Sequence, residues 1–295
     1  MATYTIEEIA DHLRTLGVEQ GDVLLVRASV RKLGKIGATG DKNSDSLIRA
    51  LLTAVGKTGT IVSLAFTKTF LFPKKHRDYV YDRYTPATTG GLANAMIRWP
   101  EAVRSRHPSN SFVAIGHDAV DILKGHDENA TCFFPMEKLC ERDSKMILIG
   151  CVEDSPGFST VHLAQDRLGL TTRTIFKNLF GVYFRRDNGA ISLFRKKDFP
   201  GCSMGFSNFY THYVKAGLLR TGFIGDAYSV LIKTRDAYGI EFDLLKKDPR
   251  VALCDNDNCE FCRGGLYYNM RCWPGYYVRK LPAIIGRVYR LVTKT

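Results

Sequence analysis

The stretch GDVLLVRASV, residues 21–30, decides the fold class of this chain. Its four consecutive apolar residues, 23–26, follow a Gly-Asp turn, which is typical of a short strand covered on both faces. Residues 44–55 predict a helix, because their apolar side chains recur at helical spacing, and residues 60–66 predict a second buried strand. A strand, a crossover helix and a strand in this order form a parallel unit. The sequence therefore predicts a layered α/β fold around a largely parallel central sheet.

The segments on either side extend this pattern through the first half of the chain. Thr5 and Glu8 have the spacing of a capping box, which predicts a first helix that ends at Gly17. Apolar runs and helical periodicity predict strands at 111–116 and 145–150 and helices at 118–123 and 160–168.

The second half adds further strands and helices of a less regular pattern. Strands are expected at 182–184, 190–194 and 228–234, and a helix at 205–217. The change of pattern marks a subdomain boundary near 170–180, but no linker composition separates two domains there. We therefore expect a single domain over residues 1–295 that includes a basic, cysteine-containing C-terminal extension at 250–295.

The composition fits a globular protein with a positive net charge. The 295 residues are 45% hydrophobic, which suffices for a large core, and no apolar run is long enough to cross a bilayer. The first residues do not resemble a secretory signal, so the cytoplasm is the expected location. Lys and Arg number 42 and Asp and Glu 30, which gives a net charge of +12. That surplus favours anionic partners, such as nucleic acid, a membrane surface, CoA or a nucleotide sugar, although solubility alone would also explain it.

Two polar segments beside predicted strands have the composition of a phosphate site. Residues 27–34, RASVRKLG, follow the first strand, and the carboxyl ends of parallel strands are where α/β folds bind ligands. Residues 104–111, RSRHPSNS, combine two arginines, a histidine and small polar side chains. The first segment is not a Walker A loop, because no Gly-Lys-Ser/Thr follows at the required spacing. Both segments also fit ordinary solvated loops.

One histidine and one aspartate are candidates for acid–base chemistry. His162 lies near the start of a predicted helix, where an imidazole can act as a general base near neutral pH. Asp226 lies in a Gly-Asp turn before the strand at 228–234, and a carboxylate there could orient a catalytic histidine. A half-buried structural histidine and a plain turn aspartate are the alternatives.

Taken together and in order, these segments resemble one family, the aminoglycoside 3-N-acetyltransferases, also called the antibiotic NAT family. The similarity extends over roughly residues 5–235, and its most specific parts are RSRHP at 104–108 and TVH at 160–162. It is also carried by residues 21–30, 55–67 and 201–227. The resemblance implies the fold of this family and the activity of an acyl-CoA-dependent N-acyltransferase.

The resemblance further implies direct transfer of an acetyl group from acetyl-CoA, or of another acyl group from its CoA ester, to an amine, without an acyl-enzyme. His162 would be the general base, and Asp226 would orient it. The CoA co-substrate would lie along the loop after the first strand and around the 104–111 motif. The residues expected to contact it are Arg27, Ala28, Ser29, Val30, Arg31, Thr67, Arg104, His107 and Ser111.

Two departures from the family pattern bear on the acceptor. Arg27 stands where the family often has His, and Gln165 stands where it usually has Glu, with Asp166 beside it. Gln165 and Asp166 are expected to contact the acceptor. Because aminoglycosides are polycations and this chain carries a charge of +12, we expect an anionic acceptor, a nucleotide-linked amino sugar used in surface polysaccharide assembly. An aminoglycoside is the alternative acceptor.

The cysteine spacing predicts a metal site near the C-terminus. Eight cysteines without a signal peptide are expected to be thiols or metal ligands rather than disulfides. Cys254, Cys259 and Cys262 have a spacing close to that of structural zinc ligands. Cys272 is expected to be the fourth ligand, with Cys202 as the alternative, and reduced free thiols are the other interpretation.

A different class of function rests on the basic C-terminus. Residues 263–295 contain no Asp or Glu, and their basic side chains alternate with tyrosines and apolar residues. Such a segment could belong to a membrane-peripheral or nucleic-acid-binding protein, for example by a contact with anionic lipids, or it could simply cover the core. No nucleic-acid-binding motif is present, so nucleic acid is not an expected partner. The sequence leaves a homo-oligomer open.

Overall fold

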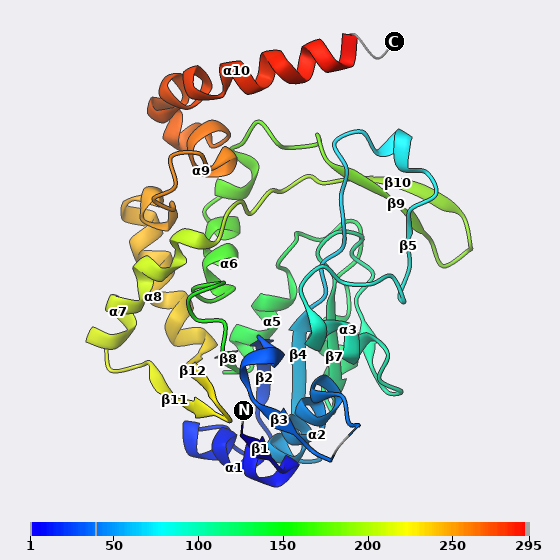
Figure 1. Cartoon of the computed structure of the whole chain (residues 1–295), viewed down its shortest axis with the longest axis vertical. Helices are drawn as coiled ribbons and strands as arrows, with labels where there is room; N and C mark the ends of the chain where they lie inside the picture. The colour runs from blue at the N-terminus through cyan, green and yellow to red at the C-terminus, as the bar shows by residue number, and fades with distance from the viewer. Residues whose placement is uncertain (1, 39, 293–295) are drawn as a thin grey trace.

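A seven-stranded sheet forms the centre of the molecule and draws strands from both halves of the chain (Figure 1). The computed structural model describes residues 2–38 and 40–292. The strands lie in the order β11-β12-β8-β2-β4-β7-β6. Their bounds are Val23–Ala28 for β2, Thr60–Leu64 for β4, Val103–Arg104 for β6, Phe112–Gly116 for β7, Lys145–Ile149 for β8, Arg220–Ile224 for β11 and Ala227–Lys233 for β12.

The parallel unit expected from residues 23–66 is present at the centre of this sheet. Strand β2, helix α2 (Asn43–Val55) and strand β4 form it, and β2 pairs in parallel with β4 on one side and β8 on the other. The layered α/β fold is therefore confirmed. The four outer pairings are antiparallel, so the sheet is mixed rather than largely parallel. Short connections contribute to this difference, because the two-residue turn between β11 and β12 can join only antiparallel neighbours.

Helices cover both faces of the sheet and enclose two hydrophobic cores. Leu24 and Val26 point into one core with α1, α2 and α3, whereas Leu25 points into the other with α4, α5, α6 and α8. This alternation follows from the two-residue period of a strand. The bounds are Ile6–Leu16 for α1, Gly91–Ile97 for α3, Ala119–Leu123 for α4, Pro135–Glu141 for α5, Thr160–Arg167 for α6, Tyr210–Lys215 for α7 and Thr234–Lys247 for α8.

The first helix has the ends that its sequence predicts. The Thr5 hydroxyl accepts the Glu8 N–H at 3.1 Å, and the Glu8 carboxylate accepts the Thr5 N–H at 2.7 Å. Gly17 ends the helix in the left-handed region, at φ 114°. The N-terminal residues are also paired with a later segment, because strand β1 (Thr3–Tyr4) runs parallel to strand β3 (Lys35–Ile36).

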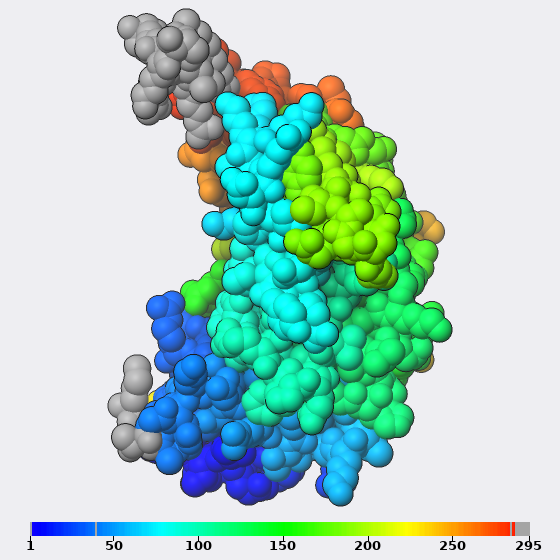
Figure 2. Space-filling model, turned by 90° about the vertical axis from the view of Figure 1, so that its right-hand side faces the viewer, coloured from blue at the N-terminus to red at the C-terminus, as the bar shows by residue number. Residues whose placement is uncertain are grey.

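A second, three-stranded sheet lies beyond the carboxyl ends of β2, β4 and β8 (Figure 1). Strands β9 (Gly181–Arg185) and β10 (Ile191–Arg195) form a hairpin, and β5 (Val80–Tyr81) pairs in parallel with β9. Figure 2 shows the loop that carries β5 and the β9–β10 hairpin side by side on one face of the molecule. The chain does change course between α6 and β9, near residues 170–180, but the two halves interleave on both sides of that point.

The C-terminal extension forms helices α9 (Glu260–Gly264) and α10 (Trp273–Val292). Helix α10 projects from the body (Figure 1), and Val278, Leu281 and Ile285 are exposed on it, so these three side chains do not cover the core. None of the helices formed by residues 2–38 and 40–292 is long and apolar enough to cross a membrane. A lipid contact of α10 stays a prediction, and residues 293–295 of the extension lie outside the described chain.

Helix α8 was not predicted from the sequence, because a carboxyl group interrupts the apolar pattern of its buried face. Glu241 lies there between Ala237 and Leu245, and its Oε1 accepts hydrogen bonds from Thr160 Oγ1 at 2.9 Å and Tyr213 OH at 2.5 Å. Its Oε2 has no partner. Burial raises the pKa of this carboxyl to about 8, so it is protonated at neutral pH.

The variant Glu241→Gln is expected to remove a pH dependence of stability. Because the folded-state pKa of Glu241 is raised from 4.5 to about 8, its contribution to stability is complete below about pH 4.5 and is lost as the pH rises towards 8. The free energy of unfolding of the native protein minus that of the variant should fall by about 1.4 kcal/mol per pH unit across this window. Urea unfolding of both proteins at several pH values measures it, and a difference that does not change with pH would contradict the assignment.

Candidate active site

A pocket of about 440 Å³ opens where the three parallel strands end. Strand β2 contributes Arg27 and Ala28, β4 contributes Ser63 and Leu64, and the segment after β8 leads to His162. The helix after β2 packs on one face of the sheet and the helix after β8 on the other, so the connections diverge here. Ligands of open α/β sheets bind at such a switch point. The expected position of the site, at the carboxyl ends of the parallel strands, is thus where the structure has its pocket.

His162 lies in the first turn of α6 and faces this pocket. Its ring packs between Phe133 and Phe206, with centroids at 4.5 Å and 4.7 Å, and it is 9% exposed. Burial, with a smaller contribution from the positive charge of Arg27, lowers the pKa of the imidazole to about 3. At neutral pH the imidazole is therefore uncharged and able to accept a proton.

Gln165 holds the ring of His162 in one orientation. Its Oε1 lies 3.0 Å from His162 Nδ1, and the two residues are three positions apart on one helix. An amide oxygen can only accept a hydrogen bond, so Nδ1 carries the proton and Nε2 keeps its lone pair. Because Gln165 is neutral, it orients the imidazole without adding the negative charge that would stabilise an imidazolium ion.

Arg27 joins the end of β2 to the loop that follows β8. Its guanidinium donates to the carbonyl oxygens of Gly157 at 2.8 Å and Ser155 at 2.9 Å, and also to the Ser155 hydroxyl. Burial lowers the pKa of this guanidinium, which still remains charged because arginine does not lose its proton in proteins. Among the described residues that line the pocket there is no Asp or Glu, so Arg27 gives the cavity a positive charge.

Asp226, which was expected to orient His162, does not contact it, and Asp166, which was expected to contact the acceptor, does not line the pocket. Asp226 lies in the turn between β11 and β12, where its Oδ1 accepts the Tyr4 hydroxyl at 2.7 Å. The structure therefore corrects the expected role of Asp226. Gln165, one helical turn from His162, is the residue that contacts the imidazole. Asp166 accepts the Thr171 hydroxyl at 3.0 Å and does not line the pocket, because it projects from a different side of α6.

Only part of the loop after β2 reaches the pocket. Arg27 and Ala28 line it, whereas the Ser29 N–H donates to the Ile149 carbonyl at 2.8 Å and continues the pairing with β8. Val30 packs against the core on the α1 side, and Arg31 is exposed. The expected CoA contacts of Ser29, Val30 and Arg31 are thus not in the lining of the cavity.

Arg104 and Ser111 serve the fold in this structure rather than the pocket. The Arg104 guanidinium donates to the carbonyl oxygens of Ala65, Thr85 and Arg83 at 2.8, 2.5 and 3.1 Å, and to Ser111 Oγ at 3.1 Å. Ser111 Oγ itself donates to the Ala65 carbonyl at 2.6 Å. Four hydrogen bonds of one guanidinium leave a single N–H for a phosphate.

The remaining residues of that predicted CoA path are also engaged by the backbone. Thr67 Oγ1 donates to the Pro108 carbonyl at 2.5 Å. His107 is completely buried, and its Nδ1 accepts the Asn110 N–H at 3.0 Å and the Ser109 N–H at 3.4 Å. The polar composition of residues 104–111 therefore satisfies a buried turn, a use that sequence composition does not distinguish from phosphate binding.

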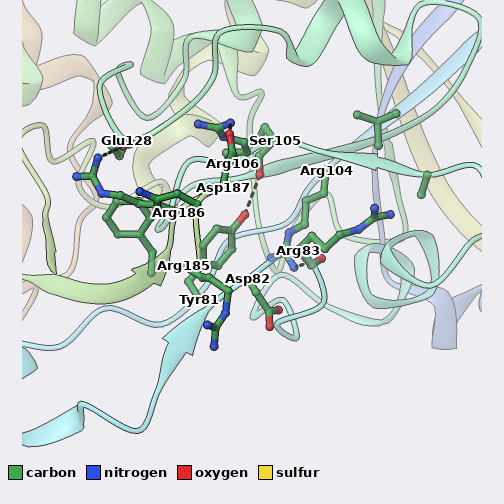
Figure 3. A pocket seen from close by; sticks show the side chains of 14 residues that line it. Tyr81, Asp82, Arg83, Arg104, Ser105, Arg106, Glu128, Arg185, Arg186 and Asp187 are labelled. Carbon is green, nitrogen blue, oxygen red and sulfur yellow. Dashed lines mark hydrogen bonds and ion pairs between the residues drawn. The ribbon is translucent and has the colours of Figure 1, made fainter. Parts of the chain in front are cut away.

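A second pocket, of about 710 Å³, is rich in arginine (Figure 3). Arg106 forms an ion pair with Asp187, and Arg186 approaches Glu128 at 3.5 Å. Arg104 lines this pocket and binds the Ala65 carbonyl, and the two neighbours of Ala65 in the sequence line the pocket of His162. The segment around Ala65 thus lies between the two cavities. No described histidine or cysteine lines the arginine pocket, whereas His162 lines the first pocket.

Sequence reasoning missed the aromatic walls of the first pocket. Phe133 comes from the segment before α5, and Thr88 and Thr89 precede α3. These residues stand in no polar or periodic pattern, so only the fold brings them to His162. Phe206 could have been found from the sequence, because it is one of the residues that carry the family resemblance.

The predicted cysteine cluster is present with one change of membership. Cys254, Cys259 and Cys262 lie together with Cys202, which packs against them from a different segment of the chain. Cys272, the expected fourth member, instead places its Sγ 3.6 Å from Asn269 Oδ1. Proximity in sequence favoured Cys272, but the chain turns away after α9 and the loop before residue 204 returns to the cluster.

A neutral, oriented imidazole that lines a pocket can accept a proton from an incoming nucleophile. Comparison with known proteins makes the class specific. Residues 25–246 match the model of the Aminoglycoside 3-N-acetyltransferase family, and the chain belongs to this family of acyltransferases.

Several relatives extend over most of the chain. Aminoglycoside N(3)-acetyltransferase III from Salmonella is 27% identical over 275 residues, which cover 83% of this chain and 92% of that protein. The crystal structure of aminoglycoside acetyltransferase AAC(3)-IVa, as a histidine-to-alanine mutant in complex with a gentamicin, has a TM-score of 0.74 and 25% identity over 89% of this chain and 96% of its own. The structure of AAC-IIIb with CoASH has a TM-score of 0.66 and 22% identity over 83% and 97%.

These relatives correct the expected acceptor. They are named as aminoglycoside acetyltransferases, and nothing in the comparisons supports a nucleotide-linked amino sugar or surface polysaccharide assembly. That expectation was wrong because a positive charge favours any anionic partner, and the CoA co-substrate is itself anionic, so the charge does not identify the acceptor.

The variant Gln165→Glu is expected to raise the pKa of His162. A carboxylate 3.0 Å from Nδ1 stabilises the imidazolium ion, and an opposite charge at this distance shifts a pKa by about 1–3 units. NMR of the imidazole between pH 4 and 8 measures it. In the native protein the His162 signal should not titrate in this range, because its pKa is about 3, whereas in the variant it should.

The matched control in the same spectra is His117, which is exposed and pairs with Asp118 at 2.8 Å. Its signal should be the same in both proteins. A His162 signal that titrates identically in the native protein and in the Gln165→Glu variant would show that position 165 does not contact its Nδ1.

Proposed function

We propose that this enzyme transfers an acetyl group from acetyl-CoA to the 3-amine of an aminoglycoside. The observation that carries the proposal is the His162–Gln165 pair, which presents a free Nε2 to a pocket at the end of β2. The relatives named as aminoglycoside 3-N-acetyltransferases, one solved with CoASH and another with a gentamicin, support the co-substrate and the acceptor.

In this mechanism the free amine attacks the thioester carbonyl of acetyl-CoA while His162 Nε2 accepts a proton from the amine nitrogen. The new C–N bond gives a tetrahedral intermediate, and cleavage of the C–S bond releases the thiolate of CoA. The imidazolium returns its proton to that thiolate, so the products are the acetamide, CoA and neutral His162. Arg27 and the hydroxyls of Ser159 and Ser203 line the pocket as donors for the developing oxyanion.

The positive charge of the pocket has two consequences for a polycationic acceptor. It lowers the pKa of an ammonium group that enters, which favours the neutral amine needed for attack. It also weakens binding of an acceptor with several charges, because no carboxylate among the described residues of the lining offsets Arg27. The anionic co-substrate has the opposite preference and is attracted by the charge of +12.

Arg27 and Ala28 are the residues of the expected CoA path that we retain for the co-substrate. Both line the pocket directly at the end of β2, so the reactive arm of CoA would meet them on its way to His162. Arg104, Ser111, Thr67 and His107 would act indirectly, by fixing the segment around Ala65 and the turn that follows residue 104.

The direct assay follows CoA release with acetyl-CoA and gentamicin, sisomicin or glucosamine as acceptors. The native enzyme should turn over an aminoglycoside, and His162→Ala should lower kcat by about 10²–10⁴-fold, the usual contribution of a general base. Calorimetric binding of CoA should be unchanged in this variant, because the residues proposed to contact CoA are Arg27 and Ala28. His117→Ala, at an exposed histidine, is the control that keeps full activity. Full activity of His162→Ala would overturn the mechanism, and turnover of no aminoglycoside would overturn the acceptor.

Ionic strength gives a separate test of the charge of the site. Salt screens both the repulsion between the chain and a polycationic acceptor and the attraction to CoA. Raising salt from about 20 to 200 mM should therefore lower KM for the aminoglycoside and raise KM for acetyl-CoA, each by a few-fold. An aminoglycoside KM that rises with salt would show that carboxylates dominate the acceptor site.

A further inference from the structure

Four cysteine sulfurs meet where the loop before η4 (Met204–Phe209) reaches the segment after η5 (Pro249–Ala252). The Sγ atoms of Cys202, Cys254, Cys259 and Cys262 all lie within 4.8 Å of one another. Zinc–sulfur bonds of about 2.3 Å in a tetrahedron place thiolates about 3.8 Å apart, so these four need to close in only slightly around an ion. Within residues 2–38 and 40–292, no other group of three or more His, Cys, Asp or Glu side chains has such an arrangement.

The backbone around the cluster donates hydrogen bonds to its sulfurs. The Cys262 N–H points to Cys259 Sγ at 3.5 Å, and the Met204 N–H points to Cys202 Sγ at 3.4 Å. The donors come from two segments far apart in the sequence, and each favours a negatively charged sulfur. Reduced thiols with no ion would not require this arrangement on both sides.

The surroundings hold the four side chains in place. Leu253, Leu266 and Tyr268 pack around the sulfurs. Arg263 donates to the Cys254 carbonyl at 2.7 Å, and Asn269 donates to the Cys262 carbonyl at 2.7 Å. Two of the cysteines are buried and two are half-buried, which limits the access of water to an ion.

The two segments also approach each other closely beside the cluster. A Cβ atom at Gly205 would lie 2.4 Å from the Leu253 carbonyl carbon, so only glycine allows the backbones to pass at this distance. Cys202 and Cys254 therefore face each other across a contact that the fold sets.

We propose that Cys202, Cys254, Cys259 and Cys262 bind one structural Zn²⁺ ion. Four thiolates in a closed tetrahedron leave no open position for water or substrate, which is the arrangement of structural zinc rather than catalytic zinc. Binding exchanges four S–H bonds for four Zn–S bonds and releases four protons, so no oxidant or reductant takes part. Two disulfides would instead require an oxidant and would separate the cluster into pairs.

The position of the site gives the ion a structural task near the pocket. Cys202 directly precedes Ser203, which lines the pocket, and Phe206 packs on the His162 ring. The ion would join this wall to the segment that leads into α9. The zinc site does not depend on which amine the enzyme acetylates, so either proposal can fail without the other.

Metal analysis of protein purified without a histidine tag tests the site. Plasma mass spectrometry should find one zinc per chain in the native protein and in the control Cys272→Ser, whose sulfur lies outside the cluster. Cys202→Ser should lose most of the zinc. A native protein without zinc would overturn the proposal, and so would retention by Cys202→Ser together with loss by Cys272→Ser.

A second experiment uses only the native chain, in case Cys202→Ser does not fold. After removal of the metal with a chelator, addition of Co²⁺ should give the intense visible absorption of a tetrahedral cobalt–thiolate centre, and Zn²⁺ should displace it. Removal of the metal should lower Tm by more than about 5 °C, and Zn²⁺ should restore it. Absence of the cobalt spectrum, or mass-spectrometric detection of disulfides among the four cysteines in the protein as purified, would overturn the proposal.

Discussion

The pairing of β2 in parallel with both β4 and β8 is the constraint on which the rest of the structure depends. Because the helices that follow β2 and β8 pack on opposite faces, the chain opens a pocket at the end of β2, and His162 lies in its wall. Arg27, at the end of β2, then fastens the loop after β8 through the Ser155 and Gly157 carbonyls. Strand β2 therefore sets the position of the pocket, and its Arg27 fixes the loop after β8 beside that pocket.

The chemistry of the site follows from burial and from a neutral partner. Between two phenylalanines, His162 is uncharged at neutral pH, and Gln165 fixes which nitrogen carries the proton. A carboxylate at position 165 would raise the pKa of His162. The imidazole would then be a stronger base, but it would also become protonated at a higher pH. In the proposed mechanism, His162 with Gln165 as its partner is unprotonated at neutral pH when the acceptor amine arrives, but the proton affinity of the imidazole is low.

Much of the fold could be predicted because apolar periodicity reports burial directly, as the parallel unit and the capped first helix show. Helix α8 escaped because Glu241 breaks its apolar face. The family resemblance pointed to His162, which lines the pocket, but not to Gln165 as its partner. A Gly-Asp turn at Asp226 carries no information about where that turn lies in space. Composition also misled at residues 104–111, whose polar groups satisfy a buried turn, and at Cys272, which is near the cluster in sequence only. Net charge misled about the acceptor, because a positive charge favours any anionic partner and the CoA co-substrate is itself anionic.

The central claim is that reaction occurs at His162 Nε2, in the pocket at the end of β2. The most direct measurement is a crystal structure of the enzyme with CoA and an aminoglycoside bound together. The expected result places the CoA sulfur beside Arg27 and Ala28, and one acceptor amine within about 3 Å of His162 Nε2. CoA bound in the arginine pocket with its sulfur remote from His162, or an acceptor amine held by another residue, would contradict it.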